Sequence, residues 1–414
     1  MKEREKNVFI STAIPYVNAK PHLGHALEYV QTDAYSRMRK LKGADVFLLT
    51  GTDDNALKNV QAAEKAGASV REYVDQNAQA FVELDARLGI AYDNFIRTSE
   101  ERHIKGAQRL WASTKPEDIY KKTYSGFYCI GCEEFKTEKD LIDGECPEHP
   151  GQKLEEVEEE NYFFRLSAYQ QTLLELIESR ELDVVPESRR NETLAFIRGG
   201  LEDFSISRST ERAKGWGVPV PGDPSQVQYV WYDALANYIT ALGYADDSEL
   251  YRKYWAGESE RIHMIGKGIN RFHTIYWPAI LLSAGLQLPT KVFVHGYITS
   301  EGQKMSKSIG NVIDPNDLLD KYGTEATRYL LLRHVHSTED SDVTWERLDE
   351  WYTANLVNGL GNLVARVMKM AETHEVTWKD YVGDDKNLHG YPGVWDTGWE
   401  SFDFKEVADG IWGK

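Results

Sequence analysis

The chain has 414 residues, which exceeds one ordinary domain and predicts about two to four. Hydrophobic residues make up 41% of it and aromatic residues 12%, which excludes a disordered chain and allows several cores. It has no apolar run of about 18 residues and no signal-peptide core, so we expect a soluble, cytoplasmic protein without a membrane partner. The net charge of −18 does not indicate a nucleic-acid-coated protein, although a local basic face would still allow an RNA partner.

The first hundred residues predict a parallel α/β sheet. Residues 7–17 have the apolar run of a buried strand, and residues 22–43 have apolar side chains at helical spacing. Residues 45–53 predict a second strand, and helical patterns follow over residues 56–88. A strand, a helix and a further strand in this order imply a right-handed crossover between parallel strands.

The same pattern returns much later in the chain. Residues 261–268 predict a strand, residues 270–285 a helix and residues 291–299 another strand. We therefore expect a doubly wound parallel sheet that is split by an insertion over residues 116–220. The Pro- and Gly-rich segment 215–224 is predicted to be a linker at the end of this insertion.

All three cysteines belong to one motif. The pattern C-x2-C, thirteen residues, then C-x2-H is formed by Cys129, Cys132, Cys146 and His149. Three thiolates and an imidazole at this spacing are typical of tetrahedral zinc with no coordination position left for water. We therefore predict one structural Zn²⁺, with free thiols near a chance histidine as the alternative.

Two short motifs indicate phosphate chemistry. In "HLGH", His22 and His25 lie one turn apart at a predicted helix start, and Gly24 leaves room for a flat base. Such a pair is a common short motif by itself. In "GQKMSKSIGN", Lys304 and Lys307 stand in a Gly- and Ser-rich loop that suits closure over a polyanion, although a solvated surface turn is the alternative.

Together these motifs carry a resemblance to a known family. "HLGH" followed far along the chain by "KMSKS" resembles the two signatures of the class I aminoacyl-tRNA synthetases. Over about residues 7–370 the chain is similar to the methionyl-tRNA synthetases, in "AIPYVNAKPHLGH", "ISRS", "YVWYDALANYITALGY", "FHTIYWPAILLSAGLQLP", "VHGYITSEGQKMSKSIGNVIDP" and "GLGNLVARV". The zinc knuckle is likewise a known form of the family's insertion.

The resemblance implies a methionine–tRNA ligase. Such an enzyme uses ATP, with Mg²⁺, to convert methionine to methionyl-adenylate, releases pyrophosphate, and transfers the methionyl group to the 3′ end of tRNA(Met). The expected partners are methionine and tRNA(Met), and we expect a monomer. Positioning and charge stabilisation would carry the rate, since the reaction needs no covalent catalysis.

The same resemblance implies roles for individual residues. The implied catalytic residues are His22, His25, Lys304 and Lys307. The implied ATP-binding residues are Gly24, Lys267, His295, Gly296, Ser306 and Lys307. The implied methionine-binding residues are Ala13, Ile14, Tyr16, Asp53, Arg208, Trp231, Ala234, Tyr238, Ile269, Phe272 and His273.

Several of these residues have simpler explanations. Asp53, implied to bind the substrate ammonium, would also serve as a helix cap, and Arg208 as half of a surface ion pair. Trp231 and Tyr238 are seven residues apart, which also suits one face of a buried helix.

The chain also departs from the family pattern. "GTDDNA" has Asn55 and Ala56 where the family usually reads G-T-D-E-H-G, and "GKG" has Gly268 where it reads G-K-D. The lost carboxylate at Gly268 is expected to change the polarity of the pocket or to leave Arg208 without a partner.

The resemblance also predicts the domain organisation. From about residue 345 the pattern is helical and similar to the start of the family's anticodon-binding bundle, which we expect to be shortened in this chain, and residues 382–399 predict a loop. The predicted domains are a first Rossmann half (1–115), a zinc-binding connective insertion (116–220), a second Rossmann half (221–299), a KMSKS-loop and stem-contact region (300–345) and a partial helical bundle (346–414).

Four other functions fit the sequence to different degrees. Another class I synthetase is disfavoured, because an editing insertion would be larger and the cysteine enzyme would use catalytic zinc. A non-catalytic synthetase-derived module predicts decayed ATP motifs, whereas both motifs are whole. A paralogue that activates an amino acid without reading tRNA normally stays open. A zinc-ribbon nucleic-acid binder is weaker, because the knuckle lacks interleaved basic and aromatic residues.

Overall fold

The structure is a computed structural model. It describes residues 7–129, 131, 134–136, 141–147, 151, 153–300, 302–304, 312–376 and 394–412. The chain divides into two compact units. Unit 1 comprises Met1–Pro21, Thr32–Glu83 and Ala91–Val294, and unit 2 comprises His22–Gln31, Leu84–Ile90 and His295–Lys414.

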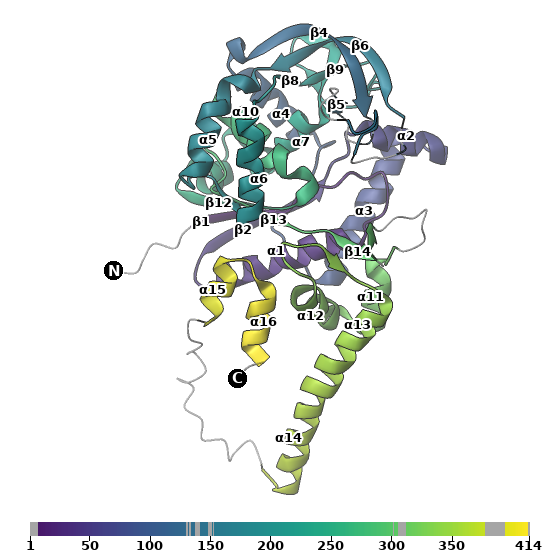
Figure 1. Ribbon diagram of the computed structural model, residues 1–414, viewed down its shortest axis with the longest axis vertical. Coiled ribbons are helices and arrows are strands. Elements are labelled where there is room, and N and C mark those ends of the chain that lie inside the picture. Colours follow the sequence, from purple (N-terminus) through teal and green to yellow (C-terminus); the bar gives the residue numbers. More distant parts are fainter. Residues whose placement is uncertain are drawn as a thin grey trace. The chain divides into compact units, whose positions relative to one another are not determined.

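The central element of unit 1 is a six-stranded sheet in the order β3-β2-β1-β12-β13-β7 (Figure 1). Its strands are β1 (Asn7–Ser11), β2 (Asp45–Thr52), β3 (Asn94–Arg97), β7 (Asp183–Val185), β12 (Ser259–Gly266) and β13 (Lys291–His295). β1 pairs in parallel with both β2 and β12, so the strand order reverses beside β1. The predicted parallel α/β sheet is confirmed, and ligands in such sheets bind beyond the carboxyl ends of the strands at this reversal.

Two predicted strands end earlier than expected. The strand predicted over 7–17 ends at Ser11, and the strand predicted over 291–299 ends at His295. After His295, β14 (Ile298–Ser300) pairs with β15 (Gln303–Lys304) and β16 (Ser341–Asp342) in a separate sheet. A side chain at Gly296 would lie 2.2 Å from the carbonyl oxygen of Glu339, so the close approach of these two backbones requires glycine.

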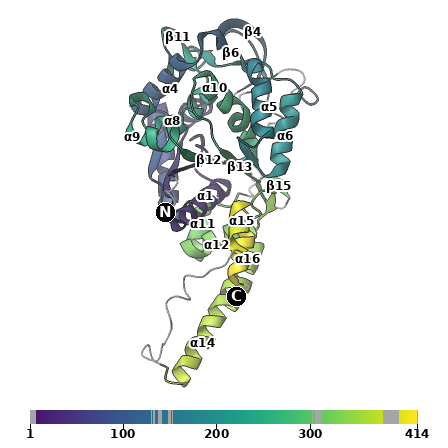
Figure 2. The same ribbon diagram turned by 90° about the vertical axis from the view of Figure 1, so that its left-hand side faces the viewer.

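Helices connect and cover the strands. The first helix, α1, runs from Leu23 to Leu41, close to the predicted span. The remaining helices of unit 1 are α2 (Leu57–Ala66), α3 (Val70–Leu88, continuing into unit 2), α4 (Glu101–Ser113), α5 (Gln170–Glu178), α6 (Glu187–Arg198), α7 (Val230–Leu235), α8 (Asn237–Thr240), α9 (Glu249–Tyr251) and α10 (Trp277–Ser283). α5 and α6 lie side by side (Figure 2).

The helical pattern over 56–88 is two helices, because Gly67 adopts a left-handed conformation (φ 68°) and ends α2. The helix predicted over 270–285 begins as a π-helical turn, Phe272–Tyr276, before α10.

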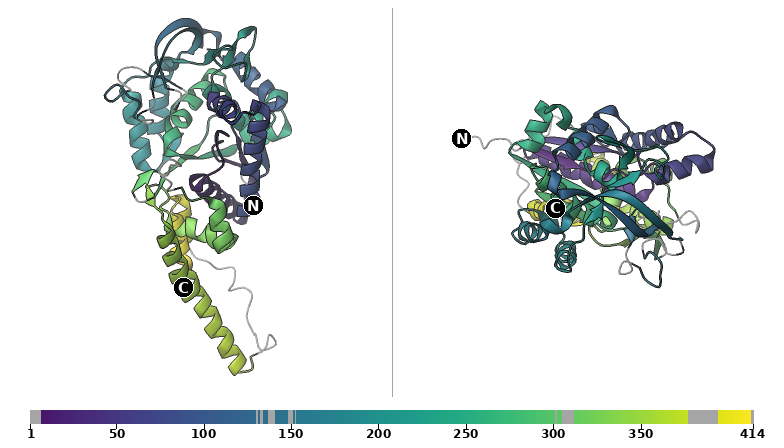
Figure 3. Two further views of the ribbon diagram at one scale, coloured as in Figure 1. Left: turned by 90° about the vertical axis from the view of Figure 1, so that its right-hand side faces the viewer. Right: turned by 90° about the horizontal axis from the view of Figure 1, so that it is seen from above.

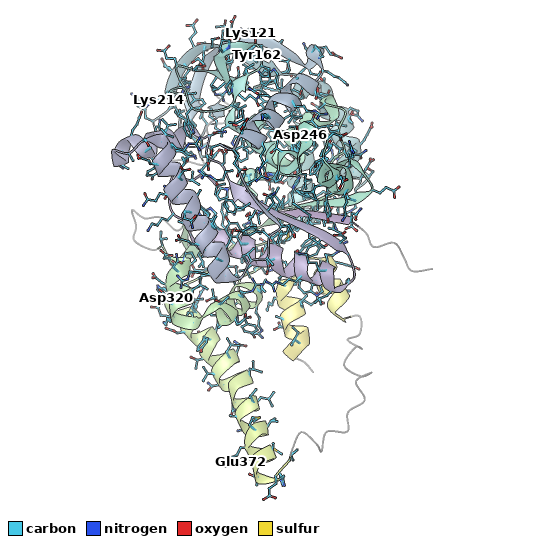
Figure 4. The ribbon with its side chains drawn as sticks, turned by 180° about the vertical axis from the view of Figure 1, so that it is seen from behind. Lys121, Tyr162, Lys214, Asp246, Asp320 and Glu372 are labelled. Atoms are coloured by element: carbon cyan, nitrogen blue, oxygen red, sulfur yellow. The ribbon has the colours of Figure 1, made fainter. Side chains whose placement is uncertain are left out.

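The segment 116–220, predicted to be an insertion, is only partly separate from the parallel sheet: β7 lies within it and pairs in parallel with β13, whereas its other strands are antiparallel. Four strands form a sheet in the order β5-β4-β6-β8, namely β4 (Ile119–Cys129), β5 (Glu134–Lys136), β6 (Glu155–Phe164) and β8 (Phe204–Ser205). Its two long strands carry Lys121 and Tyr162, whose ammonium and ring lie 4.8 Å apart (Figure 4). A second sheet has the order β10-β11-β9, namely β9 (Ser207–Ser209), β10 (Pro219–Val220) and β11 (Asp223–Gln228).

The prediction of a linker over residues 215–224 was wrong. β10 lies inside that segment and pairs antiparallel with β11, which begins inside it at Asp223. Gly222, with φ 80°, supplies the left-handed residue of the tight connection between them, so its Gly and Pro content reflects a hairpin.

Unit 2 has its own hydrophobic core. The N-terminal part of α1 and the end of α3 pack there with the helices α11 (Pro315–Tyr322), α12 (Thr324–His334) and α13 (Trp345–Trp351). A π-helical segment, Tyr352–Gly361, then leads into α14 (Asn362–Thr373), which extends as a single rod within this unit (Figure 3). The helical pattern predicted from residue 345 is confirmed as far as residue 373.

The last described segment forms α15 (Val394–Glu400) and α16 (Phe404–Trp412), with α16 packed on α12. The loop predicted over 382–399 was therefore wrong from residue 394, and residues 382–393 lie outside the described chain. Among the described helices, none has the length and apolar character needed to span a bilayer.

Candidate active site

Asp53 follows the carboxyl end of β2 and is almost fully buried (1% exposed). Its main-chain N–H donates to the carbonyl of Pro15 at 2.8 Å, and it forms a parallel bridge with Tyr16. Its Oδ1 accepts from the hydroxyl of Thr98 at 3.1 Å and from the main-chain N–H of Asn55 at 3.0 Å. The helix-cap alternative is wrong, since Ala56 is the N-cap of α2 and no side chain caps that helix.

An aromatic wall extends from this point. The ring of Tyr16 meets Trp231 edge-on at 6.2 Å, and Trp231 stacks on Phe272 with ring centroids 3.7 Å apart. The imidazole of His273 lies edge-on to Trp231 at 6.5 Å and 5.6 Å from the ring of Tyr238. Side chains from the β1–α1 loop, α7, α8 and the π-helical turn thus form one continuous surface of rings.

The hydrogen bonds of His273 determine its tautomer. Its Nδ1 lies 2.9 Å from the carbonyl of Ile269, which accepts only, so Nδ1 carries the proton. Its Nε2 lies 2.6 Å from the hydroxyl of Tyr238, which donates to it. Burial lowers the pKa of His273 to about 4, so the ring is neutral at physiological pH.

The other predicted pocket residues lie close to the same core. Ala13, Ile14 and Ile269 pack against the hydrophobic cluster that contains Tyr238, and Ala234 is buried in α7.

Arg208 lies in β9 and is buried, which contradicts a surface ion pair. Its guanidinium donates to Ser205 and to the carbonyl of Ser207 at 2.7 Å, and stacks 4.3 Å from the ring centroid of Tyr229.

In unit 2, His22 and His25 stack with ring centroids 3.7 Å apart at the start of α1. The Nδ1 of His25 accepts from the main-chain N–H of His22 at 3.1 Å, and the Nδ1 of His22 accepts from that of Gly24 at 3.1 Å. An imidazole that accepts at Nδ1 is neutral and protonated at Nε2. A side chain at Gly24 would lie 3.0 Å from the His22 ring, so glycine allows this ring to lie close to the main chain.

One turn further along α1, Glu28 contacts the last residue of β13. Its Oε2 lies 2.8 Å from Nε2 of His295, whose Nδ1 donates to the carbonyl of Gly296 at 2.8 Å. Burial lowers the pKa of His25 well below its usual range, and the neighbouring His22 and His295 lower it further.

Some predicted residues fall at the edges of the described chain. Lys267 begins a short turn after β12, and the main chain of Lys304 belongs to β15. Ser306 and Lys307 lie outside the described residues, as do Cys132 and His149.

Cys129 and Cys146 are both buried. Within the described part of the chain, no group of three or more ligating side chains is gathered. The zinc prediction is therefore untested, because two of its four ligands lie outside that part.

Comparisons with known proteins agree on one family. The family model "tRNA synthetases class I (M)" matches residues 8–156 and 149–368. The methionine–tRNA ligase of Brucella suis is 47% identical over 371 residues, which are 89% of this chain and 71% of that protein. The chain belongs to the methionyl-tRNA synthetase family.

Two further relatives are similar. The methionine–tRNA ligase of Caldanaerobacter subterraneus is 46% identical over 372 residues, 89% of this chain and 57% of its own. The solved structure of Mycobacterium tuberculosis methionyl-tRNA synthetase in complex with methionyl-adenylate superposes with a TM-score of 0.88 at 39% identity, covering 98% of this chain and 81% of that one. The parallel sheet of unit 1 is thus the class I synthetase sheet.

Sequence reasoning missed two buried acids near the predicted site residues, Glu28 and Asp233. Glu28 contacts His295, and its spacing of three residues from His25 was a signal for a shared helix face. Asp233 is an acid inside the apolar run "VWYDAL" and is fully buried, which was a signal for a buried polar contact.

Proposed function

We infer that this chain catalyses the reaction of its family. It is an aminoacyl-tRNA ligase that activates methionine with ATP and charges tRNA with it. A carboxylate oxygen of methionine attacks the α-phosphorus of ATP, the bond from that phosphorus to the bridging oxygen breaks, and pyrophosphate leaves. A ribose hydroxyl at the 3′ end of tRNA(Met) then attacks the carbonyl of the adenylate, and AMP leaves.

The bridge between Tyr16 and Asp53 carries the assignment of methionine as substrate. It places the main chain of the buried Asp53 beside that of Tyr16, whose ring belongs to the aromatic wall, and this supports one site with an anion for an ammonium and ring edges for a thioether. We assign Asp53 to the ammonium. The side chain is assigned to a pocket formed by Ala13, Ile14, Tyr16, Trp231, Ala234, Tyr238, Ile269, Phe272 and His273.

Arg208 is assigned to the neighbourhood of the substrate because of its family motif. Its buried hydrogen bonds to Ser205 and Ser207 support a fixed orientation of the guanidinium. Gly268 is exposed and has no side chain, so this position supplies no carboxylate to Arg208.

The phosphates of ATP are assigned to His22 and His25. Two neutral rings protonated at Nε2 offer N–H donors at a helix start, where the helix dipole also favours negative charge. Gly24, Lys267, His295, Gly296 and Ser306 are assigned to ATP binding, and Mg²⁺ accompanies the nucleotide.

Lys304 and Lys307 are assigned to the developing charge on the leaving pyrophosphate. A flexible stem with a compact ammonium suits a phosphate that moves during the reaction.

One structural Zn²⁺ is proposed for Cys129, Cys132, Cys146 and His149. The two described members support this, since both thiols are buried and Gly144 adopts a left-handed turn conformation just before Cys146. The ion would cross-link the knuckle and supply no reaction chemistry.

The predicted domains, an anticodon-binding helical bundle after residue 346, a monomeric state and a cytoplasmic location all stay predictions.

Pyrophosphate exchange tests the proposed function. Labelled pyrophosphate should enter ATP in the presence of methionine and of none of the other nineteen amino acids. No exchange with any amino acid would favour a non-catalytic module, and exchange with a different one would reassign the pocket. Exchange with methionine but no charging of tRNA(Met) would favour a paralogue that activates the amino acid only.

A further inference from the structure

Asn55 stands between two carboxylates. It follows β2 and is half-buried, with Asp53 and Asp54 before it and α2 after it. Its main-chain N–H donates to Oδ1 of Asp53 at 3.0 Å, and its side-chain Nδ2 donates to Oδ2 of Asp233 at 2.9 Å. The same Nδ2 donates to the carbonyl of Thr98 at 3.1 Å. Both side-chain partners accept only, so the amide orientation is determined by its surroundings.

Asp233 connects this contact to the pocket wall. It lies in α7, two residues after Trp231 and one before Ala234, and it is fully buried. Its other oxygen, Oδ1, lies 2.7 Å from Nε2 of His103, which is also fully buried. A buried carboxylate is stable only when its oxygens receive hydrogen bonds, so Asn55 and His103 together hold the carboxylate of α7.

His103 extends the network to the next helix. Its Nδ1 lies 2.8 Å from the hydroxyl of Thr240 in α8, the helix that carries Tyr238. The Thr240 side chain also packs on Gly106, where an added Cβ would lie 2.3 Å from its methyl group. Through His103 and Gly106, α4 therefore contacts both α7 and α8. Asn55 connects these three helices to the loop that carries Asp53.

We propose that Asn55 is a positioning residue for methionine, which sets the distance between the ammonium-binding carboxylate of Asp53 and the pocket wall on α7. The proposal rests on the function proposed above, because it takes Asp53 and Trp231 as substrate contacts. Asn55 acts through Asp53 and Asp233 and needs no contact with the substrate. The chain's departure from the family pattern at this position would then affect how tightly methionine is held, while the chemistry of adenylate formation stays the same.

Three variants separate this role from simple packing. Asn55→Leu keeps the approximate size and removes the donor to Asp233. Asn55→His restores an N–H donor on a larger ring. Asn94→Leu is the matched control: Asn94 is also half-buried in unit 1, but its amide donates to the carbonyl of Ala241 at 3.4 Å and contacts no carboxylate in its described hydrogen bonds.

The readouts are dissociation constants for methionine, for its analogue without the amine, 4-(methylthio)butanoate, and for ATP. Asn55→Leu should weaken methionine binding about ten- to a hundredfold, the range for a lost hydrogen bond to a charged group. The deaminated analogue and ATP should change by less than about twofold, since neither uses the ammonium site. Asn55→His should recover part of the affinity for methionine, and Asn94→Leu should leave all three constants unchanged.

Two results would overturn the proposal. One is unchanged methionine affinity in Asn55→Leu, and the other is an equal loss for methionine and for the deaminated analogue, which would mean general damage to the pocket. Asp53→Asn distinguishes these from failure of the proposed function. If Asp53→Asn leaves methionine affinity unchanged, then the proposed assignment of Asp53 to the substrate ammonium is wrong. If Asp53→Asn weakens methionine binding and Asn55→Leu does not, only the positioning role is lost.

Discussion

The hydroxyl of Tyr238 donates a 2.6 Å hydrogen bond to Nε2 of His273, and this bond joins α8 to the π-helical turn that carries Phe272. Because Nδ1 of His273 donates to the carbonyl of Ile269, the ring is a neutral acceptor. A hydrogen bond to the neutral form of His273 therefore holds this part of the wall of the proposed methionine pocket.

Tyr238→Phe should weaken methionine use without unfolding the protein. The change removes the donor to His273 and leaves its Nε2 buried without that bond, so KM for methionine should rise about tenfold. Steady-state pyrophosphate exchange measures this. Tyr232→Phe is the control, since Tyr232 is equally buried in α7 but its hydroxyl contacts Thr114 at 2.7 Å. Equal changes in KM for the two variants would contradict the assignment.

The stability of unit 1 should fall in mild acid. The pKa of His273 is about 4 in the folded chain, whereas an unfolded histidine titrates near 6.5. Between these values the unfolded state binds a proton that the folded state does not, so the free energy of unfolding decreases as pH falls through this window. The contribution is about 1.4 kcal/mol per pH unit.

Urea unfolding of the protein and of His273→Gln at pH 6.5 and pH 4.5 measures this contribution. The variant lacks the titrating ring, so its free energy of unfolding should depend less on pH. Identical pH dependence in the two proteins would show that folding does not lower the pKa of His273.

His25→Asn should slow adenylate formation while methionine still binds. Burial and the rings of His22 and His295 keep the pKa of His25 well below its usual range, so the neutral ring donates through Nε2 over the whole physiological range. Loss of a transition-state donor should lower the rate constant for adenylate formation about a hundredfold or more. Rapid-quench measurement of adenylate gives this value. His374→Asn, an exposed histidine after α14, should have no effect.

Lys307→Ala should lower the rate of adenylate formation by about two or more orders of magnitude and leave methionine affinity nearly intact, since its proposed contact is with pyrophosphate. Pyrophosphate exchange and equilibrium dialysis with labelled methionine measure the two quantities. Lys369→Ala is the control, because Lys369 is exposed and pairs with Glu372 within α14. Normal exchange in Lys307→Ala would remove the proposed role of the loop.

The purified chain should contain about one zinc ion, as four ligands of this kind predict. Cys129→Ser should lose the metal and increase amide hydrogen exchange in β4 and β5, while the parallel sheet stays protected. Elemental analysis with hydrogen-exchange mass spectrometry tests both points. A zinc-free protein from zinc-supplemented medium, with β4 and β5 fully protected, would refute the site.

Local sequence patterns determined much of this protein. Apolar runs predicted β1, β2 and β12, and helical spacing predicted α1 within two residues at each end, because burial of such side chains depends on near neighbours in sequence. The motifs around His22 and Lys307 identified the family for the same reason: each is a short, contiguous pattern.

Only the tertiary structure determined the features that depend on contacts between residues far apart in the sequence. The strand predicted over 291–299 divides because Gly296 meets the backbone of Glu339, and the Gly- and Pro-rich segment 215–224 folds as a hairpin because β10 has β11 to pair with. The contact between Asn55 and Asp233 spans 178 residues of sequence. A buried carboxylate needs a donor, but a linear pattern does not specify which donor the fold will bring to it.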